Sequence, residues 1–391
     1  MIRLTVAEEL FSGCAFCLFW VVAGYPLWLS WRARYRARVT DSAPVEPSIT
    51  AIIPVYNGGQ FLAAKLDSVL SSDYPPAKLE VLVLSDASTD DTDTIAESYR
   101  ASSCAAGRVR FLRLPRGGKA AALSTAFQHS DREIFLLTDV RQILDRNCVR
   151  LLVSRFHDPT VGAVSGNLKI RSGETSGEAG VGLYWRYESW IRRNLSLVDS
   201  LLGATGPIYA IRRSLARPLP KGCILDDMWL PMQVVLDGKR TPLAEDSVAW
   251  DYPTGLKSEF ARKVRTQAGL YQLLALEPRL LNPWSNRLWV SFMILKLGRL
   301  VLPHLLIALF LISWWLPAPI QAMVLIPQLF FYALSFLDRF IPEGAAAKRL
   351  TGPLAAFATL IAAAFCAQAI FFTDPGRFWK TTRVRITNHR S

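Results

Sequence analysis

Three long apolar runs interrupt the chain, at residues 10–31, 300–337 and 350–373. None contains a lysine, arginine, aspartate or glutamate. In the middle run, only His304 could carry a charge near neutral pH. A helix that crosses a bilayer needs about 20 apolar residues. The middle run is long enough for two such helices, with the Pro-Ala-Pro at 317–319 as the turn. The pattern therefore predicts four membrane-spanning helices.

Between the first two apolar runs, short β-rich segments alternate with amphipathic stretches. The β-rich segments are ITAIIPVY, EVLVLSDAS, VRFLRL, EIFLLTDV and VGAVSG, which start at residues 49, 80, 109, 133 and 161. FLAAKLDSVLSS and GKAAALSTAFQH have the apolar spacing of helices. Repeated βα units predict a mainly parallel α/β sheet with helices on both faces. Such a sheet binds its ligand at the carboxyl ends of its strands.

A basic segment, RARYRAR at 32–38, follows the first apolar run. That run is too long for a cleaved signal peptide. Positive charge is enriched on the cytoplasmic side of membrane helices, so we expect the amino terminus outside and residues 39–299 in the cytoplasm. Counting four crossings puts the carboxyl tail outside, whereas its own basic residues favour the inside.

We therefore expect a multi-pass protein of the cell inner (plasma) membrane with five parts. These are an anchor with its basic flank (1–39), a cytoplasmic α/β domain (40–282), an interfacial amphipathic helix (283–299), a region of about three membrane helices (300–375) and a basic tail (376–391).

Composition and charge agree with a membrane protein. The chain is 51% hydrophobic and has a formal net charge of +13, which basic loops beside anionic lipid headgroups explain. No nucleic-acid-binding motif is present, so we expect membrane lipids and not nucleic acid as partners. Cys14 and Cys17 lie inside the first apolar run without polar neighbours, which favours buried thiols over a metal site.

Polar side chains stand at the ends of the predicted strands. Pro54 and Tyr56 end the first strand, Asp86 the second and Asp139 the fourth, while Lys119 begins the helix after the third. A lysine and the backbone N–H groups of a helix start can both bind phosphate. Asp86 alone is also explained as a turn residue. The set as a whole predicts a binding site.

The ordered segments IIPVYN, VLVLSDASTDDT, GKAAAL, FLLTDV, VGAVSG, LLGATGPIYAIRR and ILDDMWLPMQVVLDG resemble the membrane-bound family 2 glycosyltransferases. These are inverting enzymes that include cellulose, chitin and hyaluronan synthases and bacterial exopolysaccharide transferases. The resemblance covers about residues 48–275. It implies a Rossmann-like α/β domain of the GT-A fold that binds a nucleotide-sugar.

The resemblance also implies roles for single residues. Asp227 matches the aspartate that acts as catalytic base, with Asp226 in the place of a neighbouring glutamate. The acceptor would lie against Gly203, Ala204, Thr205 and Gly206. The donor nucleotide would lie among Pro54, Tyr56, Asp86, Lys119, Asp139 and Arg265.

Several positions depart from the family pattern. Gly58 stands where an acidic residue usually follows Tyr-Asn, Ala87 replaces a glycine, and Arg141 replaces the second carboxylate of Asp-x-Asp. In the Gln-x-x-Arg-Trp motif of processive members, Arg265 keeps the arginine and Thr266 replaces the tryptophan. These changes favour the addition of one or a few sugars over polymerisation.

The chemistry of transfer requires a base, because an acceptor hydroxyl is a poor nucleophile at neutral pH. Asp227 is the candidate, since it begins an amphipathic helix after the turn at Gly222. Alternatively, Asp226 or Asp227 caps that helix, and one aspartate can cap while it orients the other.

The leaving diphosphate requires positive charge. Asp139 would supply one ligand to a divalent cation, Mg2+ or Mn2+, while phosphate oxygens and water supply the others. The guanidinium of Arg141 would then contact the donor phosphates. Alternatively, Arg141 points away and pairs with Asp145, one helical turn on.

Two further segments combine aromatic and basic side chains. Residues 182–197 either contact the acceptor or form an amphipathic helix with solvated arginines. Residues 283–299 are predicted to lie at the membrane interface, where Lys296 and Arg299 face lipid phosphate.

The sequence thus predicts an enzyme that moves a sugar from a nucleotide-sugar, expected to be a UDP-sugar, to a lipid-linked or polysaccharide acceptor at the cytoplasmic membrane face. A processive polysaccharide synthase of the chitin or hyaluronan type is one alternative. A catalytically silent membrane scaffold is another, raised by the changes at Gly58 and Arg141.

Overall fold

A mixed sheet forms the centre of the computed structural model, which describes residues 5–102, 107–170, 178–252, 256–342 and 344–373. Its strand order is β3-β2-β1-β4-β7-β6-β8-β5. The strands are β1 (Ile49–Val55), β2 (Leu79–Asp86), β3 (Val109–Leu114), β4 (Ile134–Leu137), β5 (Ile143–Leu144), β6 (Ala163–Ile170), β7 (Tyr209–Arg212) and β8 (Leu243–Asp251).

The predicted βα alternation is confirmed for the first half of the sheet. β3, β2, β1 and β4 are parallel neighbours. β1, β2 and β4 are apolar runs that are buried almost throughout, whereas β3, at the edge of the sheet, is only partly buried and exposes Arg110 and Arg113. β7 runs antiparallel between β4 and β6, and β5 runs antiparallel to β8. The sheet is therefore mainly parallel but mixed, with a short antiparallel strand at its centre.

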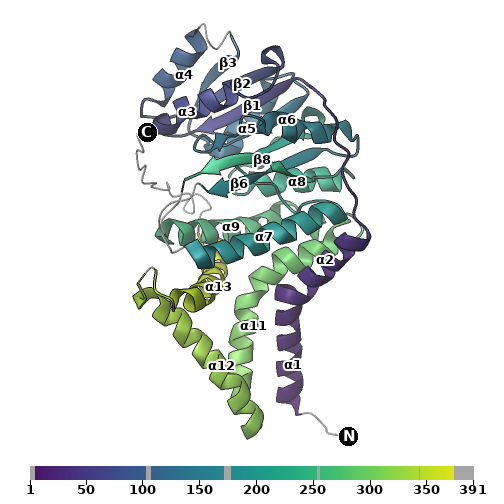
Figure 1. The fold of residues 1–391 in the computed structure, drawn as a ribbon, viewed down its shortest axis with the longest axis vertical. Helices are drawn as coiled ribbons and strands as arrows, with labels where there is room; N and C mark the ends of the chain where they lie inside the picture. Colours follow the sequence, from purple (N-terminus) through teal and green to yellow (C-terminus); the bar gives the residue numbers. More distant parts are fainter. Residues whose placement is uncertain (1–4, 103–106, 171–177, 253–255, 343, 374–391) are drawn as a thin grey trace.

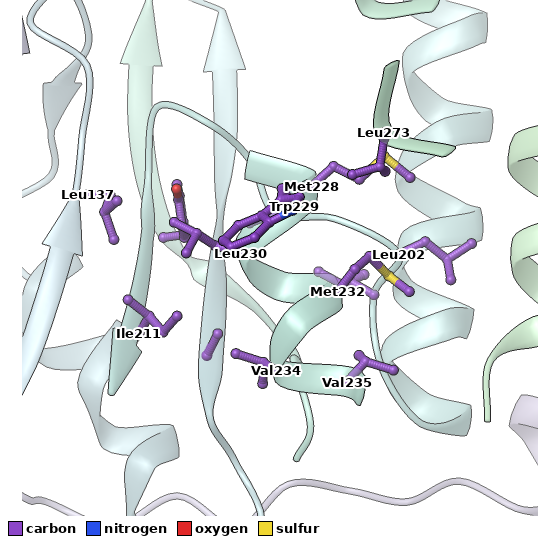
Figure 2. Packing of buried hydrophobic residues seen from close by; sticks show 14 of the residues in the cluster. Leu137, Leu202, Ile211, Met228, Trp229, Leu230, Met232, Val234, Val235 and Leu273 are labelled. Carbon is purple, nitrogen blue, oxygen red and sulfur yellow. The ribbon is translucent and has the colours of Figure 1, made fainter. Parts of the chain in front are cut away.

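Helices cover both faces of the sheet (Figure 1). α3 (Gly59–Leu70), α4 (Thr92–Ala101) and α6 (Cys148–Val153) bury one face. α5 (Gly118–Gln128) and α8 (Asp226–Leu236) bury the other. Figure 2 shows this second core, in which Leu230 and Val234 of α8 lie beside Leu137 and Ile211 of the sheet. Its close packing fixes the start of α8 against the ends of the strands.

Two long helices lie between the sheet and the apolar helices (Figure 1). They are α7 (Glu178–Val198) and α9 (Leu256–Leu276), and α13 (Lys348–Cys366) packs against both. The hydroxyl of Tyr187 on α7 donates to the carbonyl of Val22 over 2.7 Å. The α/β domain is thus joined directly to the apolar helices.

Four helices in the described part of the chain are long and apolar enough to cross a membrane, as the sequence predicts. They are Val6–Tyr35, Trp289–Ser313, Ala318–Phe340 and Lys348–Phe371. The first contains α1 (Val6–Phe19) and α2 (Tyr25–Tyr35), and α1 packs along α11 (Gly298–Ser313), while α12 (Ala318–Leu337) diverges from them (Figure 1). The second begins at Trp289, so most of the predicted interfacial segment continues into this helix. Residues 374–391, which include the basic tail, lie outside the described residues.

Candidate active site

The carboxyl ends of β1, β2 and β4 meet at one edge of the sheet, because the three strands are parallel neighbours. Tyr56 follows β1, Asp86 ends β2, and Asp139 lies just beyond β4. Pro54 lies one step earlier, inside β1, opposite Leu84. The structure therefore brings the polar strand ends together at one place.

Lys119, at the start of α5, connects the strand ends to α8. Its ammonium lies 2.9 Å from Asp139 Oδ1 and 3.1 Å from Asp226 Oδ2. Burial opposes the charged form, but the carboxylates of Asp139 and Asp226 outweigh burial and raise the pKa of Lys119. Burial likewise opposes ionisation of Asp139, and Lys119 nevertheless lowers the pKa of Asp139. Both side chains are therefore charged at neutral pH.

Asp226 and Asp227 form the first turn of α8, and Leu225 rather than either aspartate is its N-cap residue. Tyr209 Oη donates to Asp226 Oδ2 over 3.1 Å, so Asp226 is held between Tyr209 and Lys119. Burial and the negative charge of Asp226 raise the pKa of Asp227 to about 6. A buried carboxylate with this pKa can accept a proton near neutral pH, which suits Asp227 to the role of base.

The loop at 203–206 packs against this candidate base. The Ala204 N–H donates to the backbone carbonyl of Asp227 over 2.6 Å. A Cβ on Gly206 would lie 2.8 Å from Asp227 Oδ2, so any larger residue would displace the carboxylate. The predicted acceptor residues and the predicted base are thus in contact.

Arg192 of α7 supports the same loop. Its Nη1 donates to the carbonyl of Gly203 over 3.3 Å, and its Nη2 donates to Ser165 Oγ and Thr205 Oγ1, both over 2.9 Å. From the sequence, the arginines of residues 182–197 were expected either to contact the acceptor or to be exposed to solvent. The structure shows Arg192 turned inward beneath the loop, and the sequence carried no signal for its partner Ser165.

Tyr56 and Arg116 stack at the outer end of this edge. The guanidinium carbon of Arg116 lies 3.5 Å from the centre of the Tyr56 ring, and the guanidinium donates to Asp86. Asp86 also accepts from the backbone N–H groups of Gly117 (2.6 Å) and Gly118 (3.0 Å). Asp86 thus ties β2 to the turn before α5. Arg116 was not predicted as a site residue, although it directly precedes the Gly-Gly-Lys turn.

Arg141 forms its ion pair with Asp251 of β8, and not with the exposed Asp145. Its Nε and Nη2 donate to the two oxygens of Asp251 over 2.8 and 2.6 Å. Gln142 Nε2 donates to the same carboxylate over 2.9 Å. This forked pair fixes the segment after Asp139 against β8.

Arg265 of α9 interacts electrostatically with the carboxylates of Asp227 and Asp139. Burial lowers the pKa of Arg265, whereas Asp227 and Asp139 favour its charged form. The next residue, Thr266, is exposed, and its hydroxyl donates to the carbonyl of Arg262 over 2.9 Å. This position therefore keeps a cation near the site and presents no aromatic ring.

Gly58, where the family usually has an acidic residue, has no room for a side chain. A Cβ there would lie 2.7 Å from Val55 Cγ1 and 3.1 Å from Val140 Cγ1. The packing of Val55 and Val140 around Gly58 therefore leaves no space for the acidic side chain.

Residues 50–219 match the family model described as Glycosyl transferase family 2. This chain carries a family 2 glycosyltransferase domain. The matched segment contains the ends of β1, β2 and β4, Lys119 and the loop at 203–206.

Two relatives are glycosyltransferases as well. An N-acetylglucosaminyltransferase of Azorhizobium caulinodans is 25% identical over 67% of this chain and 70% of that protein. A hyaluronan synthase of Streptococcus pyogenes is 26% identical over 66% of this chain, and the match spans 65% of the synthase, which is just under two thirds of its length. The chain is thus a glycosyltransferase, and its donor and acceptor are matters for proposal.

A solved structure shares the fold of this glycosyltransferase over most of its length. It is a mannosyltransferase from Pyrobaculum calidifontis in complex with GDP-Man and Mn2+. The two are 25% identical with a TM-score of 0.66, over 92% of this chain and 98% of the other. This likeness confirms the predicted α/β GT-A fold.

The side chains of this glycosyltransferase suit a divalent cation only if the nucleotide-sugar supplies further metal ligands. Among the described residues, no group of three or more His, Cys, Asp or Glu side chains could hold a metal ion. Asp139 keeps 36% of its side chain exposed, although one oxygen contacts Lys119. One carboxylate with diphosphate oxygens and water suits Mg2+ or Mn2+. Asp139 would hold the ion, which would supply charge to the leaving diphosphate.

Lys65 of α3 holds the chain on either side of Asp139. It was not predicted as a site residue. It is fully buried and donates to Thr138 Oγ1 over 2.6 Å and to the carbonyl of Gln142 over 2.8 Å. Burial lowers the pKa of Lys65 to about 7. Its place on the apolar face of the predicted helix was the available signal, because a buried lysine there needs polar partners.

Proposed function

We propose that this glycosyltransferase moves a sugar from a UDP-sugar to a lipid-linked or glycan acceptor, with inversion at the anomeric carbon. The catalytic domain would act at the cytoplasmic face of the inner (plasma) membrane. The proposal rests on one arrangement: Lys119 joins Asp139 to Asp226, and Asp227, with its raised pKa, lies against the loop at 203–206.

The donor would bind along the strand ends. Tyr56 is 40% exposed, and the face of its ring that Arg116 does not cover would stack on the nucleobase. Lys119 and Arg265 would face the diphosphate, with the divalent cation on Asp139 and with Arg141 as a further donor-side cation. Positive charge placed there stabilises the diphosphate as it leaves.

The transfer step is a single displacement. The acceptor hydroxyl oxygen bonds to the anomeric carbon, and its proton moves to Asp227. The bond from the anomeric carbon to the diphosphate oxygen breaks, and the nucleoside diphosphate leaves with the electron pair. Attack from the face opposite the diphosphate inverts the anomeric carbon.

Turnover of a panel of UDP- and GDP-sugars by the purified full chain tests the proposal. Hydrolysis of the donor in the absence of an acceptor is a sufficient signal. Asp139→Ala should remove most of the metal-dependent activity. A chain that binds nucleotide but turns over none of the donors would be the silent scaffold. The family match favours the enzyme.

A processive polysaccharide synthase is the second candidate, because the hyaluronan synthase of S. pyogenes is among the relatives. Product size separates the two candidates.

A further inference from the structure

A cluster of charged side chains lies between α7 and the helix Trp289–Ser313, on the membrane side of the candidate active site. It consists of Glu188, Arg192, Lys296 and Arg299, and we call it the Lys296 cluster. Arg299 Nη2 lies 2.5 Å from Glu188 Oε1, and the two side chains are only 24% and 20% exposed. Charge is thus held in a largely buried contact between the domain and a membrane helix.

The Lys296 cluster has an excess of positive charge. It contains three cations and one carboxylate. Burial raises the pKa of Glu188, but Arg299, Lys296 and Arg192 together outweigh burial and lower it, so Glu188 is ionised. The partners of Arg192 are neutral oxygens of Gly203, Ser165 and Thr205.

Lys296 is the member whose charge is least compensated. Within the described part of the chain, no residue accepts a hydrogen bond from its ammonium or forms an ion pair with it at contact distance. A partly buried ammonium with three unused donors costs free energy unless an anion joins it. Ionisable residues within membrane helices are rare and mark binding or transport sites.

The position of Lys296 along its helix allows its side chain to reach lipid phosphate. The helix Trp289–Ser313 has 25 residues and is therefore roughly 37 Å long, longer than the hydrocarbon core of about 30 Å. Lys296 lies about two turns, roughly 10 Å, from the end that faces the domain. In a helix centred in the bilayer, this places the backbone of Lys296 on the order of 6–7 Å inside the hydrocarbon boundary, from where a long lysine side chain can extend its ammonium towards lipid phosphate.

The Lys296 cluster is also electrostatically coupled to the candidate base. The charge of Lys296 acts on Asp227, and Asp227 in turn acts on Arg192. Arg192 holds Gly203 and Thr205 of the loop that packs on Asp227. An anion bound by Lys296 would therefore lie beside the acceptor end of the site.

We propose that the Lys296 cluster binds the phosphate of a lipid acceptor, so that the acceptor is a membrane lipid with a phosphate close to the hydroxyl that receives the sugar. This inference rests on the proposed function and narrows its acceptor class. Lys296 and Arg299 would contact the phosphate, and Arg192 would hold the loop that orients the hydroxyl towards Asp227.

Lipid retention by the full chain tests this inference without turnover. The protein is purified in neutral maltoside micelles that contain phosphatidylglycerol or a diacylglycerol with the same acyl chains, and native mass spectrometry counts the lipids retained. We expect retention of phosphatidylglycerol and not of diacylglycerol. Lys296→Met should weaken retention by about ten-fold or more, the scale of a hydrogen bond between charged groups.

Two control variants separate binding from folding and from general charge. Lys296→Arg keeps the cation and should retain the lipid. Arg34→Met removes an exposed cation at the end of α2, also beside the membrane, and should change neither retention nor donor hydrolysis.

Three results would overturn the inference: equal retention by Lys296→Met, equal retention of diacylglycerol, or displacement of the lipid by the same concentration of inorganic phosphate or of an acidic oligosaccharide. Donor hydrolysis by the same preparation is scored separately. Retained lipid without hydrolysis would contradict the proposed function, whereas hydrolysis without Lys296-dependent retention would contradict this inference alone.

Discussion

The pKa of Asp227 sets the expected pH dependence of transfer. Burial and Asp226 raise the pKa of Asp227 to about 6. The base acts when deprotonated, so we expect kcat to rise as the pH increases through about 6 and to level off above it. Asp227→Asn keeps the shape but cannot accept a proton. It should lower kcat about a hundred-fold or more, with donor affinity within a few-fold.

Asp226→Asn is the matched control for this assignment. It removes the negative charge that raises the pKa of Asp227, so the rise in kcat should move to lower pH and the loss of rate should be milder. Measuring kcat from about pH 5 to about pH 8 for both variants decides the point. Near-normal turnover by Asp227→Asn would exclude Asp227 as the base.

Ala87 stores strain at the end of β2. It has a φ of 56°, in the left-handed region where the family usually has glycine. An L-residue pays roughly 1–2 kcal/mol there, and glycine's greater freedom in the unfolded chain offsets about 0.5–1 kcal/mol of that. We therefore expect Ala87→Gly to raise the free energy of unfolding by about 0.5–1 kcal/mol.

Thermal unfolding in detergent measures this effect. Ala64→Gly, on the exposed side of α3, is the control, and it should lower stability by about 1 kcal/mol because glycine weakens a helix interior. A destabilised Ala87→Gly protein would show that strain does not govern this position.

At the scale of the elements, apolar runs were sufficient to predict β1, β2 and β4, because central parallel strands are apolar on both faces. β3 was predicted from a β-rich run as well, although it lies at the edge of the sheet and is only partly buried. β7, with only four residues, was not predicted. Its antiparallel place between β4 and β6 depends on contacts between distant segments, and no local pattern encodes them. The same limit applies to the side chains of the site: strand ends predicted Asp86 and Asp139, whereas the pairing of Arg141 with Asp251 spans 110 residues.

The pair of Arg141 and Asp251 should hold the segment after β4 against β8. The side chains are only 19% and 4% exposed, so Arg141→Ala leaves a buried carboxylate with one remaining side-chain donor, Gln142. We expect a loss of about 3 kcal/mol in the free energy of unfolding, the lower end for a broken buried pair.

Denaturant unfolding of two variants checks this expectation. Asp145→Ala, the partner that helical spacing had suggested, is the control and should change stability by less than about 0.5 kcal/mol, as exposed positions do. Arg141→Ala with unchanged stability would show that the ion pair is not structural. Nucleoside diphosphate affinity, measured on the same proteins, tests the proposed contact with the donor.

At the scale of the whole molecule, α7 and α9 connect the candidate active site to the apolar helices. α7 carries Arg192 and α9 carries Arg265, and both helices pack against α13 (Figure 1). The sequence predicted the sheet and the membrane helices as separate parts. It did not predict this junction, because contacts such as that of Tyr187 with Val22 join segments 165 residues apart.

The junction of α9 with the last apolar helix affects the expected length of the product. In processive members of the family, the tryptophan of Gln-x-x-Arg-Trp is expected to hold the terminal sugar of the acceptor. Here Thr266 takes that position and is exposed. Tyr271, the nearest candidate for a replacement ring, packs edge-on against Phe371 of the last apolar helix, with 5.1 Å between ring centres. Thr266 therefore offers no ring for a sugar, and the ring of Tyr271 is already packed against Phe371.

An acceptor that lacks this stacking contact should dissociate between additions, since an aromatic contact contributes roughly 0.5–1.5 kcal/mol beyond its buried area. We expect the wild-type protein in lipid vesicles to add one or a few sugars to each acceptor, and Thr266→Trp to lengthen the products. Thr266→Val, which adds no ring, should leave product length unchanged. Sizing of labelled products over time checks this: a high-molecular-weight polymer that appears early, without short intermediates, would instead establish the processive synthase that the hyaluronan synthase relative favours.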